Sequence, residues 1–381
     1  MSLRSSAWSA VALIGAVACA GRSPQAVAPV PELPAGDVAV SLYLIGDAGA
    51  PDPAGEPVLE ALNRDLTSRG TRGVVVFLGD NAYPRGLPAS GAAGRLTVER
   101  RLTTLVEAVT GAGASAYFVP GNHDWAKSGP DGWAAIRRQE AFIDSVGGGA
   151  ATLHPGGGCP GPSTVDLGRL RLILVDTQWW LHNGPKPRHP DSDCVTDSKQ
   201  EVIDSLRSAL AVPPDRMVVI AAHHPLASGG VHGGYFGWRD HLFPLRPVVP
   251  WLWLPLPWLG SLYPAARQHG ISNQDIGSPV YQELISKFRR SFKEHPPDLY
   301  AAGHEHNLQV IASGAAPLEV VSGAGYYGHS GRAVPVRGTL FARKASGFVR
   351  LDVPHAGPAR LAVVEVDRTG AGSEVFSTWV E

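Results

Sequence analysis

The chain has 381 residues, of which 44% are hydrophobic, and this is enough apolar material to bury a large core. A formal net charge of −1 gives no electrostatic reason to expect nucleic acid or an acidic membrane surface as the main partner. The 45 glycines and 33 prolines indicate long, well-turned loops rather than disorder, because the apolar content is ordinary.

The first residues have the pattern of an export signal. Arg4 supplies the charged start, residues 10–17 form an apolar stretch, and small residues surround Cys19. That stretch is too short to cross a bilayer as a stable helix. Residues 16–19 resemble a bacterial lipoprotein processing site, and ordinary cleavage after Ala20 is the alternative. We therefore expect export to the periplasm or cell envelope with a lipid anchor at Cys19, a signal peptide at 1–19 and a proline-rich tether at 20–37.

Only Cys159 and Cys194 would remain after this processing. Both lie in polar loops rich in glycine and proline, and in an oxidising compartment they can pair. The sequence does not show whether their Cα atoms are close enough for a bond. A disulfide is therefore an expectation, and neither cysteine is assigned a catalytic role.

Apolar strand-like runs alternate with helical patterns along most of the chain. We expect strands at 38–45, 74–78, 116–119, 170–175, 217–222 and 299–302, and helices at 57–68, 96–109, 133–146, 198–210 and 279–292. Short β-type segments then follow at 310–311, 318–321, 347–353, 360–366 and 374–380. This order predicts an α/β architecture in which mixed sheets pack together and helices lie outside.

Side chains that bind metals follow five of these apolar strands, namely Asp47, Asp80, Asn122, His223 and the pair His304 and His306. The carboxyl ends of strands form sites in α/β sheets, so these groups can converge on one edge. Carboxylates, imidazoles and an amide without thiolates favour iron, manganese or zinc. Tyr83 lies three residues after Asp80, and its phenolate would favour a trivalent ion such as Fe(III). The alternative is that Tyr83 is an ordinary buried aromatic residue.

Five short blocks together resemble the calcineurin-like metallophosphoesterases. They are Gly46-Asp-Ala-Gly49, Gly79-Asp-Asn-Ala-Tyr83, Gly121-Asn-His-Asp124, Ile220-Ala-Ala-His223 and Gly303-His-Glu-His306. Gly49, where the wider superfamily usually has His, and Tyr83 narrow the resemblance to the small, tartrate-resistant type of purple acid phosphatase. The resemblance covers residues 38–381 apart from an insertion, and its one departure is Ile220 in place of the usual Val.

The resemblance implies a four-layer αββα sandwich of two mixed β-sheets flanked by helices, with a dinuclear metal site at the strand ends. Its Fe(III) ligands would be Asp47, Tyr83 and His306, the ligands of a second, divalent ion (Fe, Zn or Mn) would be Asn122, His223 and His304, and Asp80 would bridge the two. A metal-bound hydroxide would attack phosphorus in line. His123 would donate to the leaving oxygen or steady the phosphate, with Asp124 setting its protonation.

Residues 229–277 form an insertion that the resemblance does not cover. Its core, residues 248–263, contains Trp251, Trp253, Trp258 and many leucines broken by prolines. The prolines argue against a helix, and the unsatisfied backbone argues against membrane crossing. Two interpretations remain open, a lid that gives substrates an apolar wall or a loop that dips into the membrane interface.

His232 lies in a glycine-rich loop shortly after a metal ligand, and we expect it to contact the substrate phosphate together with Asn122 and His123. The leading prediction is an acid phosphatase-type phosphomonoesterase for a phosphorylated small molecule or lipid. A phosphodiesterase or a lipid-phosphate phosphatase using the same site is the alternative. A third interpretation is a non-catalytic envelope-binding protein. The absence of a metal-ligand residue would favour it, but no such residue is missing from the sequence. We expect a monomer that associates with the membrane through its N-terminal anchor.

Overall fold

The computed structural model describes residues 28–381 except 246–248, 250, 257–258 and 313–317. The expected signal peptide and Cys19 lie outside the described residues, and so does part of the 248–263 core of the insertion.

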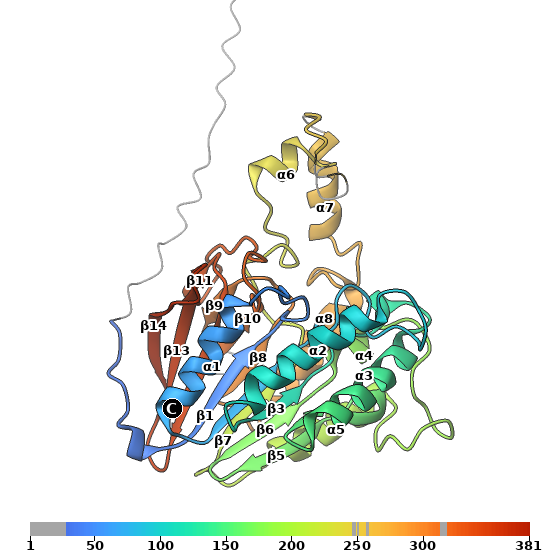
Figure 1. Cartoon of the computed structure of the whole chain (residues 1–381). Coiled ribbons are helices and arrows are strands. Elements are labelled where there is room, and N and C mark those ends of the chain that lie inside the picture. Colours follow the sequence, from blue (N-terminus) through green and yellow to red (C-terminus); the bar gives the residue numbers. More distant parts are fainter. Residues whose placement is uncertain (1–27, 246–248, 250, 257–258, 313–317) are drawn as a thin grey trace, which may run out of the picture.

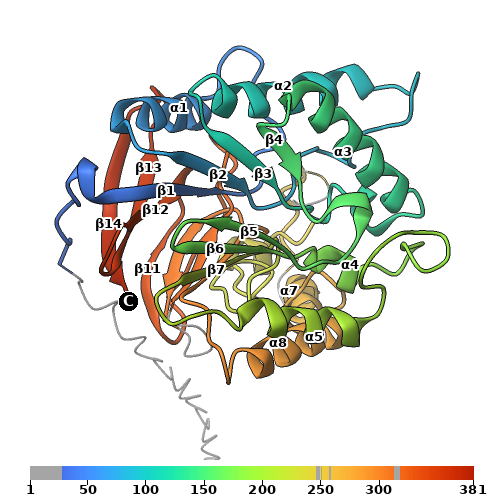
Figure 2. The same cartoon turned by 90° about the horizontal axis from the view of Figure 1, so that it is seen from below.

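Two seven-stranded β-sheets pack face to face, and helices cover their outer faces (Figure 2). The first sheet has the order β14 (Gly372–Val380), β13 (Ala359–Val366), β12 (Gly347–Pro354), β1 (Val38–Ile45), β2 (Gly73–Phe77), β3 (Ser115–Phe118) and β4 (Ala151–Leu153). The second has the order β11 (Thr339–Arg343), β9 (Leu308–Ile311), β10 (Leu318–Ser322), β8 (Leu299–Ala302), β7 (Met217–Ala221), β6 (Leu170–Leu174) and β5 (Ser163–Leu167).

Each sheet has a block of parallel strands that antiparallel strands extend. In the first sheet β1 to β4 are parallel, and β12, β13 and β14 are added in antiparallel fashion. In the second sheet β6, β7, β8 and β10 are parallel, while β5, β9 and β11 are antiparallel to their neighbours. The parallel blocks therefore place several carboxyl strand ends at one edge of the sandwich.

The helices lie on the two outer faces. Those beside the first sheet are α1 (Pro57–Arg69), α2 (Arg95–Thr110) and α3 (Gly132–Gly147), and those beside the second are α4 (Thr177–Leu181), α5 (Lys199–Leu210) and α8 (Pro279–Ser291). Ser198 caps α5 by accepting a hydrogen bond from the backbone N–H of Glu201. The four-layer αββα sandwich is thus confirmed (Figure 1).

Strand β1 shows why the layers form. Leu42 and Leu44 belong to the core between the two sheets. Tyr43 and Ile45 point the other way and pack in the core under the outer helices. Both faces of this strand are buried, so successive apolar side chains serve two different cores.

Several short elements were not predicted. They are β4, β5, β11 and α4, together with α6 (Trp238–Leu242) and α7 (Leu262–Gln268) in the insertion. Elements of three to seven residues are too short for a clear hydrophobic period. Helix α7 begins at the last two residues of the proline-broken core, where a helix was not expected. Pro264 is tolerated there because the first turn of a helix has no intrahelical acceptors for its N–H groups.

Two further segments are fixed to the sandwich. Cys159 and Cys194 form a disulfide, with Cα atoms 5.5 Å apart, as expected. Near the start of the described chain, the carbonyl of Pro31 accepts a hydrogen bond from Arg360 of β13 at 2.9 Å, and Val30 donates to Ser377 of β14 at 3.0 Å. The chain is therefore bound to the sheet from Val30 onward.

Candidate metal centre

The expected ligand residues come from both sheets and meet at the carboxyl ends of their central strands. Asp47 follows β1, Asp80 follows β2, Asn122 follows β3, His223 follows β7, and His304 and His306 follow β8. Asp47, Asp80 and His304 have positive φ angles of 55°, 55° and 68°. Such backbone is unfavourable for residues other than glycine and persists only where surrounding interactions hold it, which is common at functional sites.

Glycines let the ligand loops approach one another closely. A Cβ atom at Gly303 would lie 2.6 Å from Oδ2 of Asp47, and one at Gly121 would lie 2.4 Å from Oδ1 of Asp80. At Gly49 a Cβ atom would lie 2.3 Å from the backbone of Asn81. No side chain fits at position 49, so the loop after β1 offers Asp47 to the site and nothing from position 49.

The first group of donor atoms comes from His223, His304 and Asn122. His223 Nδ1 lies 2.7 Å from the carbonyl of Leu78, and His304 Nε2 lies 2.9 Å from the carbonyl of Gln274. A carbonyl only accepts, so each of these ring nitrogens carries the proton. The opposite nitrogens, Nε2 of His223 and Nδ1 of His304, lie 3.0 and 3.2 Å from Oδ1 of Asn122. Three lone pairs therefore converge without a hydrogen between them, which is the arrangement of a cation site.

The second group comes from Tyr83, Asp47 and His306. The phenol oxygen of Tyr83 lies 3.2 Å from Asp47 Oδ1, 3.2 Å from Asp80 Oδ2 and 3.5 Å from His306 Nε2. Nε2 of His306 lies 3.4 Å from Asp47 Oδ1. Burial, followed by the charges of Asp80 and Asp47, raises the pKa of Tyr83 well above its ordinary value. A cation among these donors would reverse that effect and favour the phenolate.

Asp80 faces both groups. Its Oδ1 lies 3.5 Å from Nε2 of His223, while its Oδ2 points to Tyr83. Burial opposes ionisation, but the nearby imidazoles of His223 and His123 bring the pKa of Asp80 below its ordinary value. The carboxylate of Asp80 is therefore ionised and lies between the two groups of donors.

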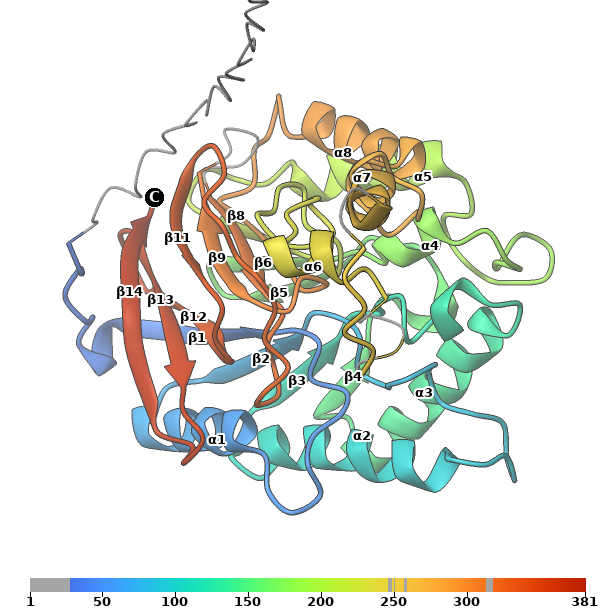
Figure 3. The same ribbon diagram turned by 90° about the horizontal axis from the view of Figure 1, so that it is seen from above.

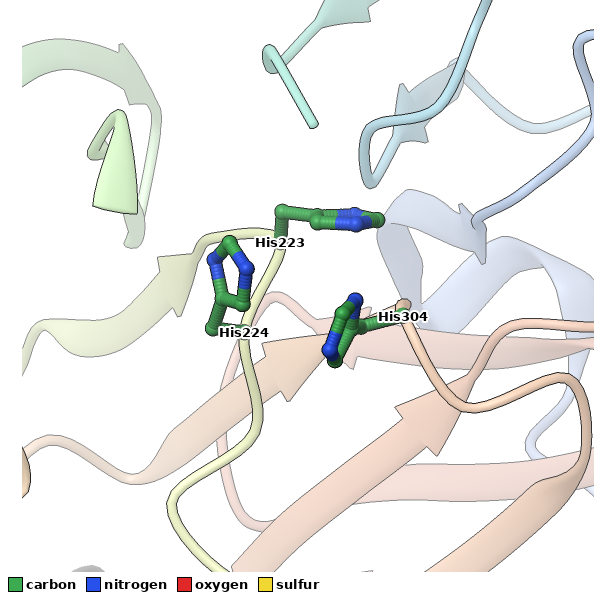
Figure 4. Close-up of side chains that lie close together, drawn as sticks. All are labelled: His223, His224 and His304. Atoms are coloured by element: carbon green, nitrogen blue, oxygen red, sulfur yellow. The ribbon is translucent and has the colours of Figure 1, made fainter. Parts of the chain in front are cut away.

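These residues fit two cations. Asp47 is 0% exposed and Asp80 is 2% exposed. Within the described ranges, the ionic partners of these two carboxylates are histidines alone. Buried charges need compensation, and the donor set of carboxylates, imidazoles, phenol and amide is one that hard or borderline metal ions prefer. His223 and Asp80 each belong to a compact cluster of metal-binding side chains (Figure 4 shows His223 and His304 with His224).

His123 has a different partner from the expected one. Its Nδ1 lies 2.8 Å from the carbonyl of Pro84, and its Nε2 lies 3.8 Å from Asp80 Oδ2. Asp124 was expected to set the protonation of His123, but its carboxylate accepts backbone N–H groups of Asn81, Ala82 and Gly121. Burial raises the pKa of Asp124 to about 7. Asp124 is thus placed to shape the loop after β2, and Pro84 orients His123.

His232 lies over the first group of donors. Its ring centre is 4.0 Å from that of His304. Its Nδ1 is 3.2 Å from Asp275 Oδ1 and 3.0 Å from Nη2 of Arg267. Arg267 Nε contacts both oxygens of the fully buried Asp275, at 2.8 and 2.7 Å. The insertion therefore brings an ion pair to the site that holds His232 in place.

Two residues beside the centre, Gln274 and His329, were not predicted from the sequence. His224 is buried beside His223 with both ring nitrogens occupied, by Thr177 Oγ1 and Gln274 Oε1 at 2.9 Å each. On the other side, the His329 ring centre lies 3.9 Å from that of His306. Neither Gln274 nor His329 lies in a recognisable motif, and only the adjacency of His224 to His223 was a local signal.

Comparisons with known proteins agree with this geometry. Residues 40–308 match the model of the family described as calcineurin-like phosphoesterase. Two solved structures share the fold. One is described as GAP50, the anchor in the inner membrane complex of Plasmodium, with 14% identity, a TM-score of 0.55, and coverage of 90% of this chain and 88% of that one.

The second is a purple acid phosphatase, PPD1, from seeds of yellow lupin (Lupinus luteus), with 15% identity and a TM-score of 0.52. The alignment covers 91% of this chain but 54% of the lupin chain, so this protein spans about half the length of that enzyme. No curated protein sequence matches the chain. At these identities the structural likeness shows the fold alone.

Proposed function

We propose that this chain, which belongs to the calcineurin-like phosphoesterase family, is a dinuclear-metal phosphomonoesterase of the acid phosphatase type. The observation that carries the proposal is the position of Tyr83, whose phenol oxygen is 3.2 Å from both Asp47 and Asp80. A phenol held between two buried carboxylates is suited to a trivalent ion such as Fe(III).

Each group of donors has one ion to hold in this proposal. Asp47, Tyr83 and His306 would hold Fe(III), while Asn122, His223 and His304 would hold a divalent iron, zinc or manganese ion. Asp80 serves both, because its two oxygens face different groups. When bound, the two ions supply the Lewis acidity that activates water and the positive charge that offsets a phosphate.

The chain's own residues position the phosphate and move a proton. His123 donates from Nδ1 to the carbonyl of Pro84, so its Nε2 is the nitrogen that faces the centre. In its protonated form, Nε2 can donate to a phosphate oxygen and then hand its proton to the leaving oxygen. The ion pair of Arg267 and Asp275 holds Nδ1 of His232, which leaves the Nε2 atom of His232 for a second phosphate contact.

Metal analysis, a visible spectrum and hydrolysis assays would test the proposal on the purified protein and its Tyr83→Phe variant. We expect two bound ions, a broad visible band that the variant loses, and faster hydrolysis of phosphomonoesters than of phosphodiesters. A colourless protein with two divalent ions would keep the hydrolase but reject the Fe(III)–phenolate site. Preference for a diester would instead favour the phosphodiesterase alternative on the same donors.

A second candidate is a non-catalytic binding protein of the envelope. The observation that favours it is the fold shared with GAP50, which is described as the anchor in the inner membrane complex of Plasmodium. A protein that takes up no metal on incubation and hydrolyses neither ester would support this candidate. The complete donor set supports the hydrolase.

We also propose that the protein is exported and lipid-anchored at Cys19. The signal-like N-terminus supports this location, and so does the disulfide between Cys159 and Cys194, because disulfides persist in oxidising compartments. Mass spectrometry of protein from a bacterial membrane fraction would test it. Acylation at residue 19 is expected, whereas an unmodified chain beginning at Gly21 would show ordinary cleavage.

A further inference from the structure

The insertion carries most of the large apolar side chains that the described structure leaves exposed. Ten of the fourteen lie between residues 235 and 271, namely Tyr235, Trp238, Leu245, Trp251, Trp253, Leu254, Leu259, Leu262, Tyr263 and Ile271. Trp251 is 78% exposed, and Leu259 and Leu262 are 62% and 64% exposed. A concentration of this kind marks an interaction surface rather than the scattered exposure of an ordinary protein surface.

The outer part of the insertion is raised above the sandwich. Helices α6 and α7 stand out from the sandwich beyond the strand ends (Figure 1), and Figure 3 shows that they lie over that edge. The insertion is held largely by its own contacts, such as Phe243 against Trp253 with ring centres 5.2 Å apart, and His241 Nδ1 at 3.1 Å from Ser261 Oγ. Of the two interpretations of the sequence, the outer part thus fits the one in which it dips into a membrane interface.

We propose that these ten residues form a docking surface that inserts into the interfacial layer of a lipid bilayer. Tryptophan and tyrosine are favoured at that depth because each has an apolar body and a polar tip. Asp240 is the one acidic residue in the sequence from 235 to 271, so acidic side chains do little to oppose approach to anionic lipids. Arg239, stacked 5.3 Å over the Trp238 ring, adds a positive charge at the edge.

The surface rests on the bilayer rather than crossing it. Among the residues that the structure describes, no helix is both long enough and apolar enough to span a membrane. A short amphipathic element with aromatic and leucine side chains lies in the interface plane. About 11 residues join Cys19 to Val30, which span at most about 40 Å when extended. A lipid at Cys19 would therefore hold the folded body close to the same bilayer.

The docking surface and the metal centre share one edge of the molecule. The insertion begins after β7, whose end carries His223, and its inner end carries Asp275 and Gln274, which contact His232 and His304. Docking would turn that edge toward the lipid headgroups. The inference that the natural substrate is a phosphorylated amphiphile rests on the proposed function. Docking to the bilayer does not depend on that function.

The test uses the full chain with Cys19→Ala in every sample, so that acylation is absent and the N-terminal segment is common to all. We would measure co-sedimentation with vesicles of phosphatidylcholine and phosphatidylglycerol in a 3:1 ratio. The test variant carries Trp251→Ser, Trp253→Ser, Leu254→Ser and Leu259→Ser. The matched control carries Leu96→Ser, Val146→Ser and Val195→Ser, which are exposed apolar residues outside the insertion.

We expect the test variant to partition at least tenfold more weakly than the parent, and the control to match the parent. Vesicles of brominated lipid should quench tryptophan fluorescence in the parent and control more than in the test variant. Equal partition of all three proteins would overturn the proposal. So would an oligomer, seen by light scattering, that the test substitutions disperse without changing partition, because the surface would then serve a second copy.

Substrate assays separate docking from catalysis. Hydrolysis of a soluble phosphomonoester should be unchanged in the test variant, while hydrolysis of phosphatidic acid in the same vesicles should fall. A protein that docks but hydrolyses neither substrate would leave the docking surface standing and reject the proposed function. Loss of soluble activity in the test variant would mean that the outer insertion is part of the site, contrary to the proposal.

Discussion

The carboxylate of Asp47 accepts a hydrogen bond from the backbone N–H of His304, with Oδ2 and N 2.7 Å apart. This bond joins the loop after β1 in the first sheet to the loop after β8 in the second. It occupies Oδ2, so that Oδ1 is the oxygen that faces Tyr83 and His306. The two sheets and the donor groups are thus aligned by the same side chain.

The substitution Asp80→Asn should remove both ions, whereas Asp47→Asn should remove one. Asp80 faces both groups of donors, and Asp47 faces only the group that contains Tyr83. Either substitution should lower phosphatase activity at least about 100-fold, since even outer-shell changes cost about 10–100-fold. Metal content by plasma emission spectroscopy is the measurement.

The control for that experiment is Asp204→Asn on the exposed face of α5, which should keep both ions. Equal metal loss in the two site variants would mean that Asp80 does not bridge. It would also mean that the two groups of donors bind their ions as one unit.

Asp275→Asn should weaken substrate binding more than turnover. The change removes the partner that fixes Arg267 and His232, so a phosphate contact is lost while the donor groups remain. We expect KM to rise about tenfold with a smaller change in kcat. The inhibition constant of inorganic phosphate should rise in parallel. Asp240→Asn, in the same insertion but bonded to Gly237, is the matched control, and a fall in kcat alone would contradict this role for the ion pair.

His182 should contribute a loss of stability in acid, which the raised pKa values of the buried carboxyls Asp124 and Asp176 oppose. Burial lowers the pKa of this imidazole to about 4 from an ordinary 6.5. Below pH 6.5 the imidazole of His182 is protonated in the unfolded chain, whereas in the folded chain it stays neutral down to about pH 4. Stability therefore decreases as the pH falls through that window. The resulting decrease in the free energy of unfolding is at most about 3 kcal/mol.

His182→Phe should remove this part of the pH dependence, because a phenyl ring keeps the packing on Trp125 without a titrating group. Thermal unfolding at pH 7.5 and pH 5 would show a smaller drop in Tm for the variant than for the parent. His269→Phe, an exposed histidine on the insertion, serves as the control and should behave as the parent does. An equal drop in all three proteins would place the acid sensitivity elsewhere.

Reduction of the disulfide should destabilise the protein without touching the metal centre. The bridge between Cys159 and Cys194 closes a separation of 35 residues, for which chain entropy gives about 4 kcal/mol, and measured values are typically about 2–4 kcal/mol. Tm should therefore fall on addition of dithiothreitol. A Cys159→Ala, Cys194→Ala variant should already have the lower Tm and no response to the reductant. An unchanged Tm in the parent would show that the bridge adds nothing.

The sequence by itself determined the layers and the donor residues. The apolar runs are long enough to be buried on both faces, and each ends in a residue such as Asp47 or His223 whose side chain binds metals. Local hydrophobicity and turn chemistry encode such features, because they depend on neighbours in the chain. The family resemblance then assigned the same residues to two ions, and the structure brings the side chains of each group close together.

Only the tertiary structure decided what surrounds those donors. Asp124 was matched with its sequence neighbour His123, yet its carboxylate turns to the loop after β2, and the carbonyl of Pro84 takes its place. Likewise Gln274 and Asp275 reach the centre from the far end of an insertion. Contacts between residues far apart in sequence leave no periodic or spacing signal, because they exist only once the sheets have packed and brought the loops together.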